Sequence, residues 1–365
     1  MAQQRDLPSL LAKIDAFIER ELAPLEKDHP QFFDHRREFA RTDLERGGAP
    51  SREWEELLVE MMRRADKAGL YRHGLPAALG GSDGTNLEMG VIREHLANRP
   101  PGHGSDATWL ETRAVRKGDD WVLNGAKRFN TGMHIAQYDI VFARTSGKPG
   151  DAKGITAFLV RTDAPGFEVP YHHWTFNMPS DHSEVVLRDV HVPNSSIIGG
   201  EGEGLAAAML FVHENRIRQA ASSLGAAQFC VDRSVKYARE RTVFGKPLAV
   251  NQAIQFPLVE LHTDCALLRE LIRDTASQMD DHGGPAVSDR VSMCNFRANR
   301  LACDAADRAI QVHGGIGYTR ALPFEHIYRH HRRYRITEGS EEMQIRNIAR
   351  SLFGFGHRAP GRSQR

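Results

Sequence analysis

The chain has 365 residues, with 48 Lys and Arg against 47 Asp and Glu, a formal net charge of +1. At ~100–200 residues per domain, this length fits two or three domains with a sizeable core. Apolar residues make up 41% and charged residues 26%, which excludes wholesale disorder and a collagen-like chain. The balanced charge predicts no nucleic-acid partner and no membrane-surface attraction. The mean hydropathy is −0.47, and no run approaches the ~20 apolar residues of a membrane helix.

Two features bear on the compartment. The first thirty residues lack a basic start followed by an apolar block and a small-residue cleavage site, so no secretory signal is expected. The four cysteines are never spaced as Cys-x-x-Cys, which favours free thiols in a reducing compartment over disulfides or a zinc site. The sequence therefore predicts a cytoplasmic protein whose cysteines are unpaired; they are Cys230, Cys265, Cys294 and Cys303.

The first hundred residues have helical patterns. Apolar residues recur at helical spacing between Leu11 and Leu22, and Pro24 is expected to end that run. A second helix is predicted to begin after Ser51, a suitable N-cap, and to stop at Gly69. A third is predicted to begin near Asn86.

The pattern changes after residues 99–102, where two prolines and a glycine fall together. Short runs rich in β-branched and aromatic residues follow, separated by turn signals and not by helical patterns. Such an arrangement predicts an antiparallel sheet or a small barrel. The runs are 114–115, 121–123, 138–143, 155–160, 167–169 and 184–187.

Helical patterns return at Leu205 and continue almost to the end of the chain. Long helices joined by short loops make a bundle. The predicted helices are 205–241, 252–280, 287–312, 323–331 and 340–353. We therefore predict a mostly helical α+β fold with an N-terminal helical domain at 1–101, a middle antiparallel β domain at 102–203 and a C-terminal four-helix bundle at 204–365.

Common catalytic motifs are incomplete. The glycines of 200–204 and of 315–317 do not complete Gly-x-Gly-x-x-Gly, and Gly245-Lys246 is followed by a proline, unlike a phosphate-binding loop. His213-Glu214 lacks the second histidine of a zinc protease, and the paired histidines lack further ligands at metal-binding spacing. No metal site is expected.

Several other segments together resemble the acyl-CoA dehydrogenase family over nearly the whole chain. They occur in the family's order and at its separations. In the C-terminal part they are Tyr-Ala-Arg-Glu-Arg-Thr-Val-Phe-Gly-Lys-Pro-Leu at 237–248, Gln-Val-His-Gly-Gly-Ile-Gly-Tyr at 311–318 and Arg-Ile-Thr-Glu-Gly-Ser at 335–340. In the middle part they are Gly-Ser-Asp at 104–106, Gly-Ala-Lys-Arg-Phe-Asn-Thr at 125–131 and Asp-Val-His-Val-Pro at 189–193.

The resemblance implies that the protein binds FAD, partly across a subunit interface of a homodimer or homotetramer. A flavin dinucleotide needs positive charge for its pyrophosphate and a flat or polar lining for its ring. Taken singly, the same residues could be a surface arginine, a core phenylalanine and a helix-capping glycine pair. The residues that the resemblance assigns to FAD are Ser105, Phe129, Thr131, Arg241, Phe244, Gln252, Gln311, Gly314, Gly315, Ser340 and Glu342.

The resemblance also makes Glu338 the base that removes the α-proton of an acyl-CoA thioester. The β-hydride passes to flavin, the product is the trans-2-enoyl-CoA, and an electron-transfer flavoprotein or a similar acceptor receives the electrons. The residues implied on the substrate side are Ser105, Asn215, Arg216, Gly339 and Arg350.

Two alternatives concern the base. Some family members carry it on the earlier helix, where this chain has Asn215, which cannot accept a proton. Glu214 is one residue away and should point elsewhere on a helix. The other alternative is that Glu338 is an ordinary carboxylate at the start of a helix.

The chain also departs from the family pattern. The family has further helices and a first β-strand between the third helix and the β domain, and several dozen residues of that stretch are absent here. The chain is then either a naturally shortened form with a more open pocket or an internally deleted variant. Two other functions stay open: a catalytically silent scaffold or regulatory subunit, and a flavin oxidase acting on a related substrate.

Overall fold

The computed structural model describes residues 7–34, 38–97, 110–148, 150–151, 153–176 and 181–354. The chain divides into two compact units, and each is described by itself. The first comprises residues 1–84 and 106–211, and the second residues 85–105 and 212–365. The three-part division drawn from the sequence stays a prediction.

The N-terminal helices follow the sequence pattern with one exception. Helix α1 (Leu7–Phe17) continues through the π-helical turn η1 (Ile18–Leu22) into α2 (Ala23–Asp28). The expectation that Pro24 ends the helical run was wrong: the run continues past Pro24, which follows directly on the π-helical turn η1, where the regular i→i−4 hydrogen bonding is already interrupted. The predicted second helix is confirmed as α4 (Arg52–Lys67). Short elements complete this part: α3 (Pro30–Phe33), η2 (Glu38–Arg41), β1 (Thr42–Asp43), β2 (Ala49–Pro50) and η3 (Ala77–Leu79).

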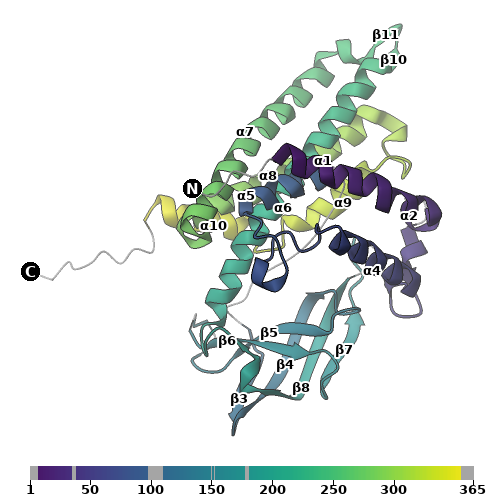
Figure 1. The fold of residues 1–365 in the computed structure, drawn as a ribbon. Coiled ribbons are helices and arrows are strands. Elements are labelled where there is room, and N and C mark those ends of the chain that lie inside the picture. The colour runs from purple at the N-terminus through teal and green to yellow at the C-terminus, as the bar shows by residue number, and fades with distance from the viewer. Residues whose placement is uncertain are drawn as a thin grey trace, which may run out of the picture. The chain divides into compact units, whose positions relative to one another are not determined.

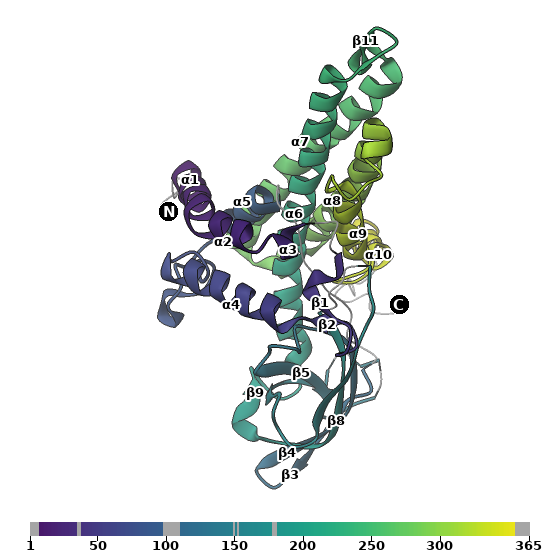
Figure 2. The ribbon, with the colours of Figure 1, turned by 90° about the vertical axis from the view of Figure 1, so that its right-hand side faces the viewer.

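The β zone forms one seven-stranded sheet in the order β7-β8-β4-β3-β5-β6-β9. The neighbouring strands are antiparallel, as predicted, except β3 and β5, which run parallel and meet at the single pair Arg113 and Arg144. The sheet curls strongly in Figure 2. The strands are β3 (Arg113–Lys117), β4 (Asp120–Thr131), β5 (Tyr138–Arg144), β6 (Ile155–Arg161), β7 (Phe167–His172), β8 (His182–Pro193) and β9 (Ile197–Ile198).

One face of the sheet is buried on a cluster of large side chains that includes Trp121, Leu123 and Phe158. Strand β4 shifts register against β8 between Leu123 and Gly125. At Gly125 the backbone has φ +146°, and a Cβ there would lie 2.6 Å from the Cα of Thr112. Only glycine fits this irregularity, which bends the strand.

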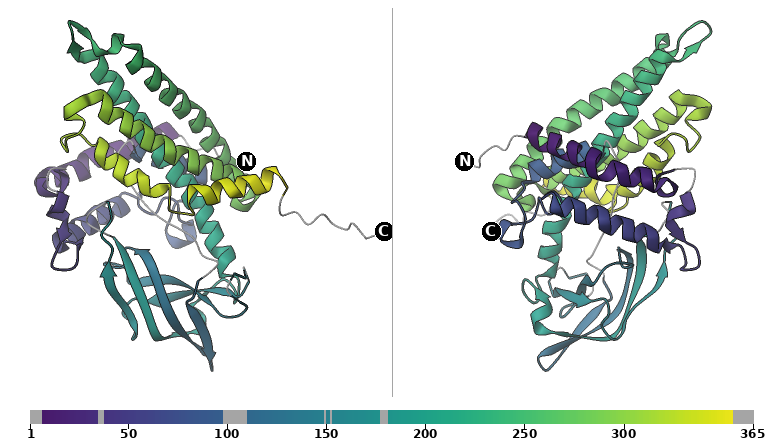
Figure 3. Two further views of the ribbon diagram at one scale, coloured as in Figure 1. Left: turned by 180° about the vertical axis from the view of Figure 1, so that it is seen from behind. Right: turned by 45° about the vertical axis from the view of Figure 1, so that its right-hand side comes forward.

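Five helices follow, and each confirms a helix that the sequence predicted. Helices α6 and α7 are joined by a hairpin, β10 (Thr242–Val243) with β11 (Lys246–Pro247), at the far end of the pair (Figure 1). Helices α9 and α10 pack against α8 (Figure 3). The helices are α6 (Gly204–Glu240), α7 (Gln252–His282), α8 (Ser288–His313), α9 (Phe324–Tyr334) and α10 (Glu341–Leu352).

Helix α5 (Asn86–Ala97) belongs to the same unit as α7 and is fastened to it at its N-terminus. The Thr85 hydroxyl accepts from the N–H of Glu88 at 3.1 Å, and the Glu88 carboxylate accepts from the N–H of Thr85 at 3.0 Å, forming a capping box. The Asp280 carboxylate on α7 accepts from the backbone N–H groups of Asn86 and Leu87. These bonds satisfy helix-terminal N–H groups that would otherwise lack partners.

Within the described residues, no helix combines the length and apolarity needed to cross a membrane. All four cysteines are buried free thiols.

Candidate active site

Glu338 lies in a tight turn between α9 and α10. Its φ is +55° and that of Gly339 is +81°, so two successive residues are left-handed. A glutamate there is strained, and such strain concentrates at functional sites. A Cβ on residue 339 would lie 2.9 Å from Nη2 of Arg216, so glycine is needed for space as well as conformation. Both the backbone conformation and the lack of space therefore restrict which residues this turn can contain.

The Glu338 side chain is only 4% exposed. Nδ2 of Asn215 on α6 donates a hydrogen bond to its Oε1. The Arg216 guanidinium donates to the backbone carbonyl oxygen of Glu338 from Nε at 2.8 Å and from Nη2 at 2.6 Å. Burial raises the pKa of Glu338 to about 7, although the Asn215 hydrogen bond and the Arg216 charge oppose that rise. A carboxyl with this pKa can accept or release a proton near neutral pH.

A second carboxylate anchors the turn from the other side. Both oxygens of Glu341 accept from Arg335, at 2.9 and 3.0 Å, and from Arg300, at 2.9 and 3.2 Å. These charge-assisted bonds, those of Arg335 foremost, lower the pKa of Glu341 to about 2. Glu341 is therefore ionised and structural, in contrast to Glu338 three residues earlier.

The alternatives for the base separate clearly. Glu214 pairs with Arg218 on the same helix at 2.7 Å, and it does not bond Glu338. Ser340, not Glu338, occupies the N-cap position of α10, so the view of Glu338 as a routine helix-capping carboxylate was wrong. Asn215, expected on the substrate side, is hydrogen-bonded to the Glu338 carboxylate.

Other predicted residues of α10 lie on its surface. Glu342 is exposed in the first turn, where its own backbone N–H and the Ser340 hydroxyl lower its pKa. Arg350 is exposed in the last turn. Part of the basic run at 329–335, which precedes the turn, is already engaged within the protein. Arg329 pairs with Glu325 at 2.6 Å, and His330 and His331 are buried.

A second cluster of predicted residues lies at the hairpin end of α6 and α7. Arg241 is exposed just after α6, Phe244 is fully exposed at the hairpin turn, and Gln252 begins α7. Gln311, Gly314 and Gly315 are exposed at the end of α8. Packing brings the two groups into one region: Val312 of α8 shares a core cluster with Ala238 and Leu258 of α6 and α7, and the Tyr237 and His313 rings stack at 4.3 Å.

The two clusters are far apart along one helix. Arg216 and Glu240 both lie on α6, and at ~1.5 Å per residue their Cα atoms are about 36 Å apart. This separation exceeds the length of a dinucleotide. One bound flavin cannot therefore touch the Glu338 turn and the hairpin of the same chain.

Phe129 and Thr131 belong to the other unit. Phe129 is exposed with φ +61°, and its ring lies 4.6 Å from that of His173. The hydroxyl of Thr131 lies 3.5 Å from Nδ1 of His182. Ser105 lies outside the described residues, as does the Gly-Ser-Asp segment that contains it.

The hairpin cluster fits a flavin dinucleotide. Within the described part of the chain, the side chains of Arg241, Gln252 and Gln311 have no hydrogen-bond partner, so their donors are open to a ligand. A Cβ on Gly314 or Gly315 would meet no atom within 4 Å, so the backbone there is also open to close approach. An exposed flat ring completes the set of groups that a pyrophosphate and an aromatic ring need.

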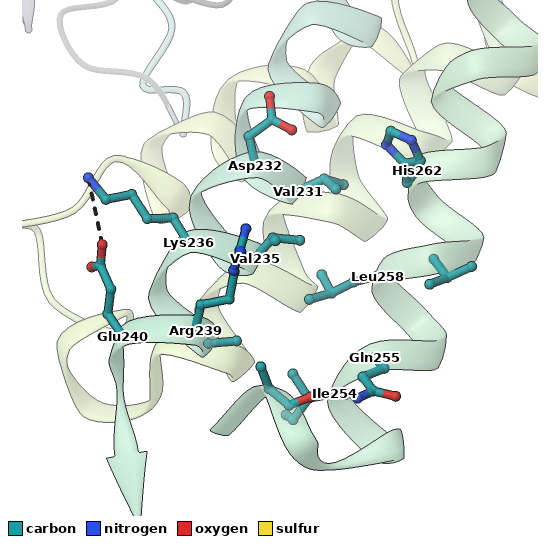
Figure 4. A pocket seen from close by; sticks show the side chains of 13 residues that line it. Val231, Asp232, Val235, Lys236, Arg239, Glu240, Ile254, Gln255, Leu258 and His262 are labelled. Atoms are coloured by element: carbon teal, nitrogen blue, oxygen red, sulfur yellow. Dashed lines mark hydrogen bonds and ion pairs between the residues drawn. The ribbon is translucent and has the colours of Figure 1, made fainter. Parts of the chain in front are cut away.

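An apolar groove of about 710 Å³ opens next to the hairpin, between the C-terminal end of α6 and the start of α7 (Figure 4). It contains no residue of the Glu338 turn. Its walls are apolar along the helices and charged at the rim, where Lys236 and Glu240 approach each other at 4.0 Å. The lining residues are Val231, Asp232, Val235, Lys236, Ala238, Arg239, Glu240, Ala249, Ile254, Gln255, Leu258, Val259 and His262.

No group of three or more His, Cys, Asp and Glu side chains in the described ranges is arranged to hold a metal ion.

Comparison with known proteins identifies the family. The profile of the acyl-CoA dehydrogenase C-terminal domain matches residues 202–353, and that of the acyl-CoA dehydrogenase middle domain matches residues 100–190. The 3-(aryl)acrylate reductase of Clostridium sporogenes is 32% identical over 383 residues, covering 96% of this chain and 98% of the relative. The chain belongs to the acyl-CoA dehydrogenase family. It is an oxidoreductase of that family.

Further likenesses agree with this membership. Butyryl-CoA dehydrogenase from Megasphaera elsdenii superposes with a TM-score of 0.80 at 25% identity, covering 97% of this chain and all of the other. The caffeyl-CoA reductase–Etf complex subunit CarC of Acetobacterium woodii is 33% identical over 67% of this chain and 64% of its own length. The fold prediction, mostly helical α+β with a middle sheet, is confirmed.

The alignment with the arylacrylate reductase spans 383 positions, more than the 365 residues of the whole chain. The relative therefore carries stretches that this chain lacks. That difference agrees in direction with the predicted shortening, whose position between α5 and β3 stays a prediction.

Sequence reasoning missed the groups that hold the Glu338 turn from behind. Asn295 and Gln344 are 0% exposed. Asn295 lies among buried apolar residues of α8, whereas the only other buried residue of α10 is Glu341. For Asn295 the signal was a polar residue on an apolar helix face. A single sequence does not show whether such a residue faces the core.

Proposed function

We propose that this protein oxidises an acyl-CoA thioester to its trans-2-enoyl form, with Glu338 as the base that removes the α-proton. The observation that carries this proposal is the dry, strained Glu338 turn, in which burial brings the pKa of the carboxyl to about 7. A general base works best when its pKa lies near the operating pH.

The residues around Glu338 have distinct tasks in this proposal. Asn215 donates to the carboxylate oxygen and so orients it. Arg216 holds the backbone of the turn and supplies a positive charge beside the ionised form. The α-proton of the substrate moves to the Glu338 carboxylate. A bound FAD, held by residues such as Arg241 and Gln252, would supply the two-electron acceptor for the β-hydride.

The test is a comparison of flavin reduction in matched variants of the FAD-loaded protein. Glu338→Gln keeps the size and the acceptor for Asn215 but cannot take a proton, so flavin bleaching by acyl-CoA should slow by at least ~100-fold. Glu214→Gln lies on α6 and breaks only the contact with Arg218, so its rate should stay within several-fold of wild type. The reverse ranking would show that the base is assigned wrongly.

The reverse reaction, reduction of an unsaturated substrate, is a second candidate function and is favoured by one specific observation. The relative that aligns over 98% of its length is a 3-(aryl)acrylate reductase. A carboxyl with a pKa of about 7 is protonated in part of the molecules at neutral pH, so it can also deliver a proton to the α-carbon of an unsaturated substrate. Anaerobic mixing of the reduced protein with an enoyl-CoA or an arylacrylate, followed by flavin absorbance, distinguishes reduction from dehydrogenation.

We further propose that FAD is shared between two copies of the chain. Arg241, Phe244 and Gln252 of one copy would hold the nucleotide end of a flavin whose ring serves the Glu338 turn of the other. The ~36 Å along α6 and the exposed hairpin support this arrangement. A monomer in light scattering at working concentration would contradict it.

An electron-transfer flavoprotein or a similar acceptor is the proposed partner for reoxidation. One relative is named as a subunit of an Etf complex. Turnover with acyl-CoA that depends on an added acceptor would support this assignment, whereas peroxide release without one would indicate an oxidase.

A further inference from the structure

Behind the Glu338 turn, buried amide side chains connect three helices of the same unit, and the proposed chemistry does not use them. Asn295, Asn299 and Gln344 are each 0% exposed. Burying an amide side chain costs folding free energy unless it forms hydrogen bonds. The partners of these three amides therefore show what they hold in place.

Asn295 on α8 uses both its donors and its acceptor. Its Nδ2 donates to the carbonyl oxygen of Arg216 at 2.8 Å and to Oε1 of Gln219 at 3.3 Å. Its Oδ1 accepts from Nδ2 of Asn299 at 3.0 Å and from Nε2 of Gln344 at 2.8 Å. One side chain therefore ties α6, α8 and α10 together.

The same bonds reach the turn. Nε2 of Gln344 also donates to the carbonyl oxygen of Gly339 at 2.8 Å. The carbonyl oxygen of Glu338 is held by the Arg216 guanidinium. Both backbone carbonyls of the turn are thus held by residues that meet at Asn295.

We propose that Asn295 and Gln344 are positioning residues that keep the Glu338 carboxylate aimed into its dry site by fixing the backbone of the turn. The inference rests on the proposed role of Glu338 as the base. A left-handed glutamate relaxes unless its surroundings over-determine it. Without the Gln344 donor, the turn can open and let water reach the carboxylate.

The charged and polar groups that act on the Glu338 carboxyl are few. Arg216 and Asn215 both approach from α6 and favour its ionised form. Loosening the turn would expose the Glu338 carboxyl to water and so weaken mainly the effect of burial, which raises its pKa. Position and proton affinity should change together.

A second arm of the network supplies a matched control. Nδ2 of Asn299 donates to the carbonyl of Tyr334 at 2.9 Å, so its Oδ1 is the atom that accepts from the Ser223 hydroxyl at 2.6 Å. Nδ1 of His331 then donates to the Ser223 oxygen at 3.0 Å. This arm is equally buried but leads to α9, and Ser223 bonds neither Glu338 nor Gly339.

The first measurement compares Gln344→Met with Ser223→Ala in the FAD-loaded protein. Gln344→Met keeps the length of the side chain and removes the Nε2 donor. We expect flavin reduction by acyl-CoA to slow at least ~10-fold with little change in KM, and the acid limb of its pH profile to move down by about one unit. Ser223→Ala should lower the unfolding temperature comparably and leave rate and profile unchanged.

The second measurement does not need turnover. Infrared titration of the Glu338 carboxyl, assigned by its loss in Glu338→Gln, should show a midpoint of about 7 in the wild type. In Gln344→Met that midpoint should fall by about one unit or more, and in Ser223→Ala it should stay. Asn295→Ala should repeat the result, which keeps a second variant if one fails to fold.

The outcomes separate the two proposals. A shifted infrared midpoint in a protein that reduces no flavin would overturn the proposed function and support the positioning role. An unchanged midpoint in Gln344→Met, or an equal shift in Ser223→Ala, would overturn the positioning role whatever the protein catalyses.

Discussion

Glu338→Gln should make the protein more stable at alkaline pH. In the folded state burial raises the pKa of Glu338 from 4.5 to about 7. A shift of that size corresponds to about 3 kcal/mol at ~1.4 kcal/mol per unit. At pH 8 the wild type therefore holds a buried, ionised carboxylate that costs about 3 kcal/mol relative to the unfolded chain.

The sign follows from proton binding. Between pH 4.5 and about 7 the folded protein retains a proton that the unfolded chain has lost, so the free energy of unfolding falls as pH rises through this window. A neutral glutamine has no such dependence, and its oxygen still accepts from Asn215. We expect Glu338→Gln to exceed the wild type by about 2–3 kcal/mol at pH 8 and to match it near pH 4.5.

Urea unfolding of the FAD-saturated proteins at the two pH values measures the difference. Glu214→Gln, a partly exposed carboxylate on α6, is the control and should show no pH-dependent gain. The reasoning is refuted if Glu338→Gln is no more stable than the wild type at pH 8, or if its advantage is the same at both pH values.

Three further changes test separate parts of the structure. Gly339→Ala must push a Cβ to 2.9 Å from Arg216 in a left-handed turn, so flavin reduction should fall at least ~10-fold; Gly118→Ala, also left-handed but with nothing within 4 Å, should keep the rate. Arg241→Gln should weaken FAD retention on gel filtration by ~10-fold by removing a charge-assisted contact. Burial lowers the pKa of His331 to about 3, so the wild type should lose stability as pH falls from ~6.5 towards 3, and His331→Phe should flatten that dependence in acid titration followed by circular dichroism.

Periodicity was sufficient to predict the large elements. The helices α6, α7 and α8 begin and end within a few residues of the predicted bounds. Apolar residues that recur at helical spacing over many turns fit a helix and no other regular structure. Pro24 was misjudged because proline is as compatible with a first turn as with a break. The parallel pairing of β3 with β5 joins residues distant in sequence, which no local pattern indicates.

The sequence was sufficient to name the main residues of the candidate site, but not the buried amides that hold the Glu338 turn in place. Glu338 and Arg216 were named from the resemblance to the acyl-CoA dehydrogenase family, and the structure joins them through the backbone carbonyl of Glu338. The link between Asn295 and Gln344 crosses 49 residues. Both are ordinary amides in helices, and only tertiary packing shows that the core contains them.

The geometry of the turn also bears on the direction of the reaction. Strain, burial and a half-titrated carboxyl all meet at Glu338, and a network of neutral amides that cannot titrate holds the turn from behind. Near pH 7 the same residue is therefore as ready to give a proton as to take one. The base does not choose between oxidation and reduction. That choice must lie with the potential of the electron partner and with whether a saturated or an unsaturated acyl group fits beside the turn.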